Sequence, residues 1–123
     1  MTLRYALQHS VNTIAVQLAD KVGMRKVLDL ATNLGISTLD KSKDNNLAAA
    51  LGGLTSGVKP IDMAVAYGTL ANGGVKVKPV AITKIVDRNG QVVEENSTEE
   101  QRVVDAKDAY VITNMLESVV SGG

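Results

Sequence analysis

The sequence predicts an α+β fold that is mostly helical and carries a small β-hairpin. Apolar residues recur at helical spacing in several segments that are separated by glycines. One stretch, residues 78–95, has strand composition and is interrupted by Asp87-Arg88-Asn89-Gly90, whose Asn-Gly pair is a strong hairpin signal. The elements follow in the order helices, β-ribbon, helix, which is typical of an α+β domain with mostly helix.

The first third of the chain predicts three helices. They are expected over residues 3–7, 13–21 and 24–34. Thr2 is a candidate N-cap for the first helix. Gly23 and Gly35 are the expected stops of the second and third, because glycine commonly follows the last helical residue. The inner stripe expected for the third helix comprises Val27, Leu30, Ala31 and Leu34.

The middle of the chain is less regular. Residues 36–46 are polar and charged, which predicts a surface connection. Residues 47–51 predict one apolar turn, which Gly52-Gly53 ends. Two adjacent glycines indicate either a close approach of the backbone to another element or a flexible link, and the sequence alone leaves both open.

Two further helices flank the predicted ribbon. Pro60 fits the first turn of a helix over residues 60–71. The two strands are expected over residues 78–86 and 91–95. Residues 94–102 are rich in charge and predict a loop. The last helix is expected from about Asp105, which can cap it, to about residue 120.

The composition bounds the class of protein. A chain of 123 residues is one ordinary domain, and 45% apolar residues indicate a globular one. It has no Phe or Trp, so the core must consist of Leu, Val, Ile, Ala and Met, which hints at a piece of a larger body. Tyr67 and Tyr110 are expected in the core. The methionines expected to fill gaps there are Met24, Met63 and Met115.

The charge pattern excludes several functions. Thirteen basic and thirteen acidic residues give zero formal net charge, with no basic stripe for nucleic acid. The absence of cysteine excludes disulfides and thiolate metal sites. His9 is the single histidine and has no second His or Cys to complete a metal site, so we assign it a surface or capping position and no catalytic role. No apolar run approaches the roughly 18 residues needed to span a bilayer.

The segment Ser10-Val11-Asn12 places a hydroxyl and a carboxamide two residues apart, ahead of an apolar helical run. Residues i and i+2 do not share a helix face, so these groups converge on one ligand only if the chain turns there. Ser and Asn are also common N-caps, and for a bare Ser-x-Asn capping is the usual explanation.

The surrounding sequence adds a family resemblance. Several blocks, in order, are similar to the penicillin-binding transpeptidases, most closely to their bifunctional class A group. The blocks are Leu3–Asn12, Leu51–Val58, Pro60–Tyr67, Leu70–Gly74, Lys78–Asp87 and Asn114–Val120. The resemblance implies that residues 1–123 are part of a penicillin-binding transpeptidase domain with the serine β-lactamase or DD-transpeptidase-like fold.

The family's active site combines Ser-x-x-Lys, Ser-x-Asn and Lys-Thr-Gly elements. Only the second occurs here, as Ser10-Val11-Asn12, so the resemblance implies that the other two lie outside residues 1–123. Ser56-Gly57-Val58-Lys59 satisfies Ser-x-x-Lys literally. We reject it because Gly57 weakens a helix and Pro60 disfavours the α region for Lys59.

The resemblance also implies roles for two residues. Ser10 belongs to the proton relay beside the nucleophile's lysine. Asn12 holds that lysine through its carbonyl oxygen and donates its amide to the peptide chain of the substrate. The implied reaction is acyl transfer through a serine ester, from a peptidoglycan stem peptide ending in D-Ala-D-Ala to an amine of a neighbouring stem. β-Lactams mimic the donor, and no metal or organic cofactor is implied.

The implied parent protein is membrane-anchored, acts on the extracytoplasmic face of the bacterial cell membrane and carries a glycosyltransferase domain. We expect the segment alone to be soluble, inactive and prone to self-association, because its apolar faces exceed what it can cover. The alternative is a non-catalytic helical interaction module on the same scaffold. Finding Ser-x-x-Lys before and Lys-Thr-Gly after this segment in the parent reading frame would favour the enzyme.

Overall fold

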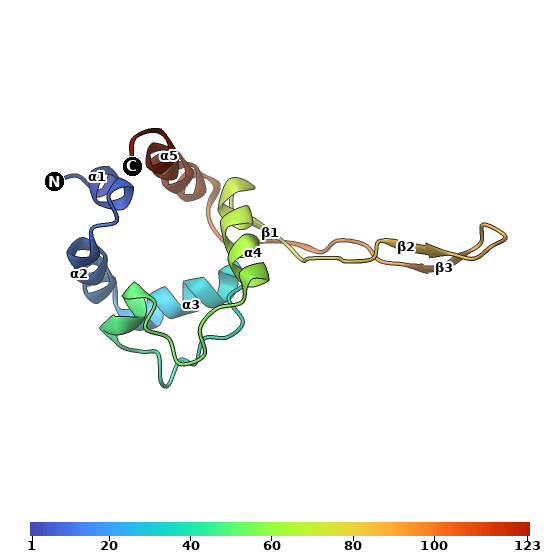
Figure 1. Cartoon of the computed structure of the whole chain (residues 1–123), viewed down its shortest axis with the longest axis horizontal. Coiled ribbons are helices and arrows are strands. Elements are labelled where there is room, and N and C mark those ends of the chain that lie inside the picture. The colour runs from blue at the N-terminus through green and yellow to red at the C-terminus, as the bar shows by residue number, and fades with distance from the viewer.

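The computed structural model describes all residues from 1 to 123. Its helices form an open ring, and its strands form a long arm that projects from the ring (Figure 1). The helices are α1 (Leu3–Gln8), α2 (Asn12–Val22), α3 (Met24–Leu34), the 3₁₀-helix η1 (Leu47–Leu51), α4 (Pro60–Ala71) and α5 (Ala106–Gly122). The strands are β1 (Val75–Val77), β2 (Lys84–Val86), β3 (Val92–Glu95) and β4 (Glu100–Arg102). The predicted α+β, mostly helical class is confirmed.

The helix boundaries follow local signals. The Thr2 side chain accepts a hydrogen bond from the Tyr5 amide at the start of α1, and Asp105 accepts one from Lys107 at the start of α5. Pro60 is the first residue of α4. Gly23 and Gly35, with φ angles of 95° and 123°, follow the last residues of α2 and α3. These five predictions are confirmed, because each depends on residues within one turn of the helix end.

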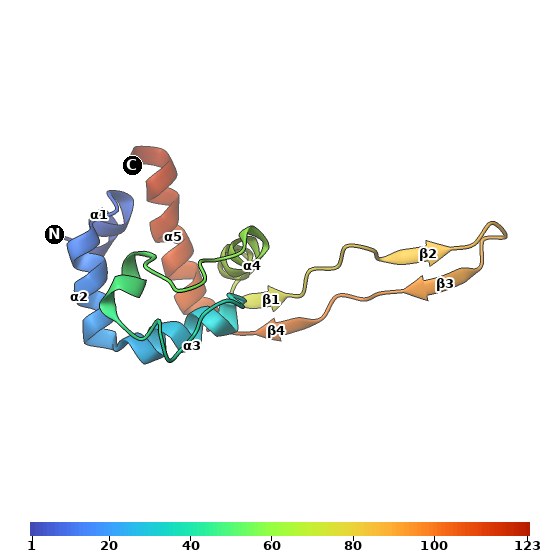
Figure 2. The same ribbon diagram turned by 60° about the horizontal axis from the view of Figure 1, so that its bottom comes forward.

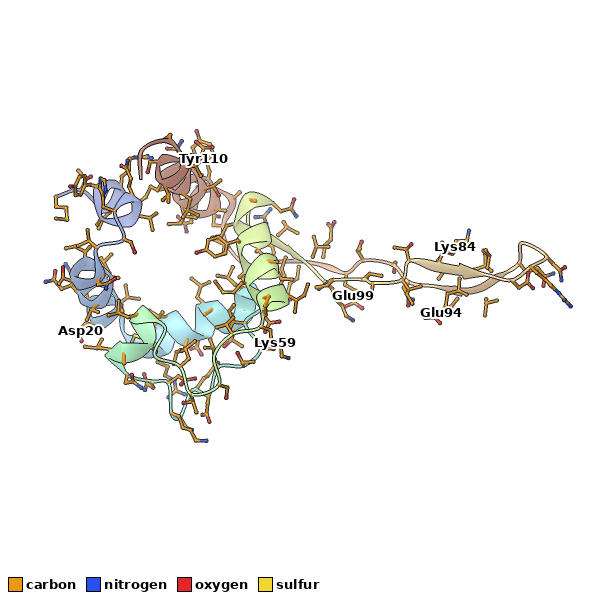
Figure 3. The ribbon with its side chains drawn as sticks, viewed as in Figure 1. Asp20, Lys59, Lys84, Glu94, Glu99 and Tyr110 are labelled. Carbon is orange, nitrogen blue, oxygen red and sulfur yellow. The ribbon has the colours of Figure 1, made fainter.

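The ribbon differs from its prediction. It contains two separate antiparallel ladders, β1 with β4 and β2 with β3, along one arm (Figure 2). The strand predicted over residues 78–86 is formed only at Lys84–Val86, and the loop predicted over residues 94–102 includes the whole of β4. That loop prediction is wrong because an exposed strand needs no apolar face. Lys84 and Glu94 stand in solvent on opposite faces of the arm (Figure 3).

The hairpin turn at the tip of the arm is confirmed. Gly90 has a φ of 80°, and the Asp87 carboxylate accepts hydrogen bonds from the amides of Asn89 at 2.8 Å and Gln91 at 2.9 Å. The pair Gly52-Gly53 resolves as a close approach within the chain's own 3₁₀-turn. A Cβ on Gly53 would lie 3.0 Å from the Ala48 carbonyl oxygen, whose hydrogen bond with the Gly53 amide is 2.9 Å long.

The buried core is small. Only 10 of 123 residues are buried, and the one cluster among them comprises Ala19, Met24 and Leu28. Leu30, predicted on the inner stripe of α3, is 45% exposed, whereas Leu28 is 3% exposed. The prediction for Leu30 is therefore wrong.

Three other predicted core residues are exposed. Tyr67 is 54%, Tyr110 71% and Met63 39% exposed, so these core predictions are wrong (Tyr110 is labelled in Figure 3). Tyr67 shares an apolar face of α4 with Met63 and Ala64, whereas Tyr110 has Lys107 and Asn114 one turn away on α5, so its helix face is polar. Met24 is buried and Met115 half-buried, in line with their predicted packing.

The connection over residues 36–46 is not wholly on the surface as predicted, because Ile36 and Asp44 are buried. The Asp44 carboxylate accepts hydrogen bonds from the Thr55 amide at 2.8 Å, the Thr55 hydroxyl at 2.7 Å and the Asp40 amide at 2.8 Å. Hydrogen bonds make burial of a carboxylate tolerable, and this one ties the connection to the loop before α4.

Candidate functional site

The Ser10-Val11-Asn12 segment forms a tight turn between α1 and α2. Ser10 has a φ of 51° and is the one non-glycine residue with a positive φ. Its amide donates to the Leu7 carbonyl oxygen at 3.2 Å, and the Val11 amide donates to that of Ala6 at 2.9 Å. Val11 is extended and Asn12 begins α2. The predicted turn directly ahead of the helix is confirmed.

Capping does not explain this turn. The N-cap of α2 is Val11, and no side chain caps that helix end. Ser10 and Asn12 are both exposed, and neither side chain forms a hydrogen bond within the chain. A left-handed conformation at a residue with a Cβ costs about 1–2 kcal/mol. Strained residues of this kind cluster at functional sites, so the turn is a candidate for function.

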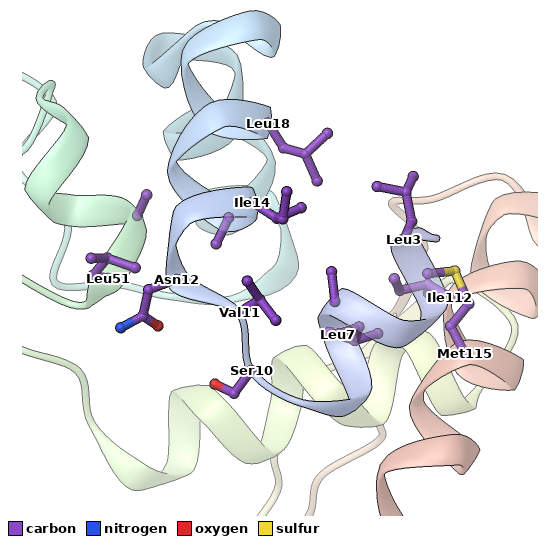
Figure 4. A pocket seen from close by; sticks show the side chains of 13 residues that line it. Leu3, Leu7, Ser10, Val11, Asn12, Ile14, Leu18, Leu51, Ile112 and Met115 are labelled. Carbon is purple, nitrogen blue, oxygen red and sulfur yellow. The ribbon is translucent and has the colours of Figure 1, made fainter. Parts of the chain in front are cut away.

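The turn lies at the rim of an apolar groove of about 550 Å³ between α1, α2, η1 and α5 (Figure 4). Of its 13 lining residues, 11 are hydrophobic, and the two others are Ser10 and Asn12. Figure 4 shows Ile14 and Leu18 of α2 pointing toward Leu3 of α1. The structure thus brings the two predicted site residues together as the polar groups of an otherwise apolar groove.

No charge from this chain lies in the groove lining, and no group of three or more His, Cys, Asp or Glu residues could hold a metal ion. His9 is the exposed C-cap of α1, and its ring lies 4.2 Å from that of Tyr5 between centroids. The position agrees with the surface or capping placement predicted for it. A neutral pair such as Ser10 and Asn12 can position a substrate or a neighbouring amine, but it supplies neither a base nor an activated nucleophile.

Four carboxylates elsewhere have lowered pKa values because hydrogen bonds favour their charged forms. The Ser42 hydroxyl and amide lower the pKa of Asp40 to about 2. Hydrogen bonds from the Thr55 amide, the Asp40 amide and the Thr55 hydroxyl, in decreasing order of effect, lower the pKa of Asp44. Ser37 does the same for the pKa of Asp62, and Lys41 does so for that of Asp29. All four stand in loops or on helix surfaces, and none of them lines the groove beside the Ser10 turn.

The conformation of residues 56–59 supports the rejection of this segment, Ser56-Gly57-Val58-Lys59, as a nucleophile motif. The segment is a loop before α4, Gly57 has a φ of 67°, and Lys59 is extended with a ψ of 139°. The Lys59 ammonium donates to the Ser37 hydroxyl at 3.2 Å and not to Ser56. The helical geometry that would aim an amine at the serine is absent.

One contact near the site was not predicted. The Arg4 guanidinium of α1 donates to the main-chain oxygen of Asn114 on α5 at 2.8 Å and to its side-chain Oδ1 at 2.7 Å. These residues are 110 positions apart, and no spacing rule relates them. Arg4 stands in one of the blocks that resemble the transpeptidases, but nothing in the sequence indicated its partner.

Comparisons with known proteins identify the family. The model of the penicillin binding protein transpeptidase domain matches residues 1–123. The chain belongs to the penicillin-binding protein transpeptidase family. Penicillin-binding protein 1A of Aquifex aeolicus (strain VF5) is 43% identical over 123 residues, which are 100% of this chain and 16% of that protein. This chain therefore spans about a sixth of the length of that relative.

Solved transpeptidase structures share the fold. Penicillin-binding protein A of M. tuberculosis, as its penicillin G acyl-enzyme complex, matches with a TM-score of 0.86 and 20% identity over 98% of this chain and 32% of that one. The D,D-transpeptidase domain of a peptidoglycan glycosyltransferase from Eggerthella lenta matches with a TM-score of 0.82 and 24% identity, over 100% of this chain and 37% of that one. The predicted membership in the transpeptidase-like fold is confirmed.

Proposed function

We propose that this chain is the Ser-x-Asn segment of a peptidoglycan DD-transpeptidase domain and forms one wall of its active site. The observation that carries the proposal is the Ser10 turn, a strained conformation that leaves a hydroxyl and a carboxamide unpartnered at the rim of an apolar groove. Family membership supports it, and so does the relative of the same fold that forms an acyl-enzyme with penicillin G.

In the proposed reaction a serine outside residues 1–123 attacks the carbonyl carbon of the penultimate D-alanine of a stem peptide. The serine ester forms, the peptide bond breaks, and the terminal D-alanine leaves as an amine that takes up a proton. The hydroxyl proton of the attacking serine passes to the lysine of the Ser-x-x-Lys element, which also lies outside residues 1–123, and Ser10 relays a proton from that lysine to the leaving amine. Asn12 holds the lysine through its Oδ1 and donates its amide to the stem peptide. These roles position groups and stabilise charge.

We propose that the apolar groove receives the segment that carries the nucleophile. Eleven hydrophobic residues line the groove, and Ser10 and Asn12 lie at its rim, where they would face whatever fills it. The family's nucleophile element must come from outside this chain, which spans 16% of the Aquifex aeolicus relative. A β-lactam would then acylate the assembled site and not this segment alone.

The proposed setting is cell-wall synthesis on the extracytoplasmic face of the bacterial membrane, as part of a class A protein that also carries a glycosyltransferase domain. The class A relatives support this setting. Within residues 1–123, no helix has the length and apolar character that a membrane crossing requires. In the proposal the anchor therefore comes from another part of the parent protein.

The test compares asparagine variants of the parent protein in acylation by a fluorescent penicillin. Asn12→Ala is expected to slow acylation about 100-fold, the typical effect of losing one positioned donor. Asn45→Ala is the matched control, since Asn45 is an exposed loop asparagine outside the groove. Normal acylation by Asn12→Ala would refute the assigned role, and a parent unable to bind penicillin at all would favour the non-catalytic interaction module.

A further inference from the structure

Helix α1 depends on α5 for its position. It has six residues, too few for a stable helix on its own, and Ala6 is its only buried residue. The hydrogen bonds between the two helices are those that Arg4 donates to the main-chain oxygen and Oδ1 of Asn114, at 2.8 and 2.7 Å. The attachment of α1 therefore combines close packing against α5 with the two hydrogen bonds from Arg4.

The backbone of the Ser10 turn is in its own right fixed to α1 by hydrogen bonds. Its two amide hydrogen bonds, from Ser10 and Val11, end on carbonyl oxygens of the last turn of α1. The Val11 carbonyl oxygen accepts from the amides of Ile14 and Ala15 and so joins the turn to α2. Because the side chains of Ser10 and Asn12 make no hydrogen bond, the backbone of the turn and of α2 sets their positions. A shift of α1 would be transmitted directly to both.

The Arg4 contact fixes direction as well as distance. A planar guanidinium that donates two parallel bonds to neighbouring acceptors constrains the angle between the helices, which a lysine cannot do. The Asn114 amide nitrogen donates to Glu117 Oε2 at 3.2 Å, which directs Oδ1 toward Arg4. The contacts thus run in one chain from Arg4 through Asn114 to Glu117. Arg4 stands near the start of α1, and the Ser10 turn follows the end of that helix.

We propose that Arg4 is a positioning residue for the transpeptidase site: by clamping α1 to Asn114 of α5 it holds the Ser10 turn in its left-handed conformation. The inference rests on the proposed function of Ser10 and Asn12. Arg4 does not line the groove, and in this proposal it acts only through the backbone of α1.

The experiment uses the parent protein and measures the limiting acylation rate, the apparent dissociation constant for a reporter penicillin, the titrated fraction of active protein and the Tm. Arg4→Ala should lower the limiting rate about 10-fold or more with the active fraction unchanged, since small misplacements of positioning groups have effects of this size. The limiting rate of Arg4→Lys should lie between those of the unmodified parent and Arg4→Ala. If Arg4→Ala does not fold, the comparison of Arg4→Lys with the unmodified parent is the test. Arg25→Ala, an exposed arginine of α3, is the control. A lower Tm or active fraction with a normal rate per active molecule would overturn the proposal.

A double-mutant comparison shows whether Arg4 acts through the turn. Added to Ser10→Ala/Asn12→Ala, Arg4→Ala should slow acylation by less than about 3-fold, because coupled residues are not additive. If Arg4→Ala slowed the triple variant by as much as it slows the parent, Arg4 would act independently of Ser10 and Asn12, and the proposal would be overturned. If Asn12→Ala itself acylates normally, the proposed function fails. If Asn12→Ala is slow and Arg4→Ala is normal, only the role of Arg4 fails.

Discussion

Replacing Leu18 or Leu28 by alanine tests whether the apolar groove is filled in the parent protein. Leu28 is 3% exposed in the one buried cluster of this chain, whereas Leu18 lines the groove and is 40% exposed. Both changes remove the same atoms from a helix, so their difference reports only on what surrounds each side chain. The measurement is urea unfolding of residues 1–123 and of the parent transpeptidase domain.

The expected sizes follow from burial. Leu28→Ala should lower the free energy of unfolding by about 3 kcal/mol in both proteins, because it removes buried methyl and methylene groups and leaves a cavity. Leu18→Ala should cost only about 1 kcal/mol in residues 1–123, where much of the side chain already contacts water. In the parent domain the cost should rise to about 3 kcal/mol if the groove is occupied.

Leu47→Ala is the control, since Leu47 is 39% exposed on η1 and does not line the groove. It should cost about the same in both proteins. An equal, small cost for Leu18→Ala in the two proteins would refute the reasoning, because it would mean that nothing in the parent covers this wall of the groove.

Three other predictions concern residues 1–123 alone. Intact-mass spectrometry after incubation with a reactive penicillin should show no covalent adduct, because Ser10 lacks a nearby amine and Ser56 lacks a helix to aim Lys59; an adduct on either serine would contradict this. Light scattering should show self-association at roughly tens of micromolar, driven by exposed apolar faces, and a clean monomer would count against it. Acid should loosen the loop that Asp40 and Asp44 hold. Their pKa values are lowered in the fold, so their stabilisation is complete above the ordinary aspartate pKa near 4. It is lost as the pH falls through the folded values, about 2 for Asp40. The protection factor of the Thr55 amide, which corrects for the intrinsic pH dependence of exchange, should therefore fall below about pH 4, and a constant protection factor down to pH 2 would exclude this role.

Much of the helical fold could be predicted because its signals are local. Thr2, Pro60 and Asp105 act on amides or dihedral angles within one turn, so the residue types alone indicate the boundaries. Strand β4 could not be found in this way. Its partner β1 lies 25 residues earlier, with Gln101 opposite Lys76, and its charged side chains are compatible with a strand only because both faces meet water.

The tyrosines show a second limit. An apolar helix face indicates that something covers it, but it does not say whether the cover belongs to the same segment of chain. Tyr67 lies on the apolar face of α4 and yet is 54% exposed, whereas Tyr110 is 71% exposed on a face of α5 that also carries Lys107 and Asn114. Ser10 shows the opposite case: the turn could be predicted from Ser-x-Asn, whereas its positive φ depends on hydrogen bonds from the turn back to α1.

The residue between Ser10 and Asn12 does not cap α2, and the helix is less stable for it. Val11 occupies the N-cap of α2, where Ser or Asp would add about 1 kcal/mol of stability by accepting an amide hydrogen bond. Its side chain lines the groove instead, with the apolar residues of α1 and α2. A capping hydroxyl or carboxylate at this position would also compete for the donors and acceptors that Ser10 and Asn12 leave open. In the proposed site, the uncapped helix end and the strained serine have one explanation: the backbone of α1 holds the turn, so that both polar side chains stay free for a partner in the groove.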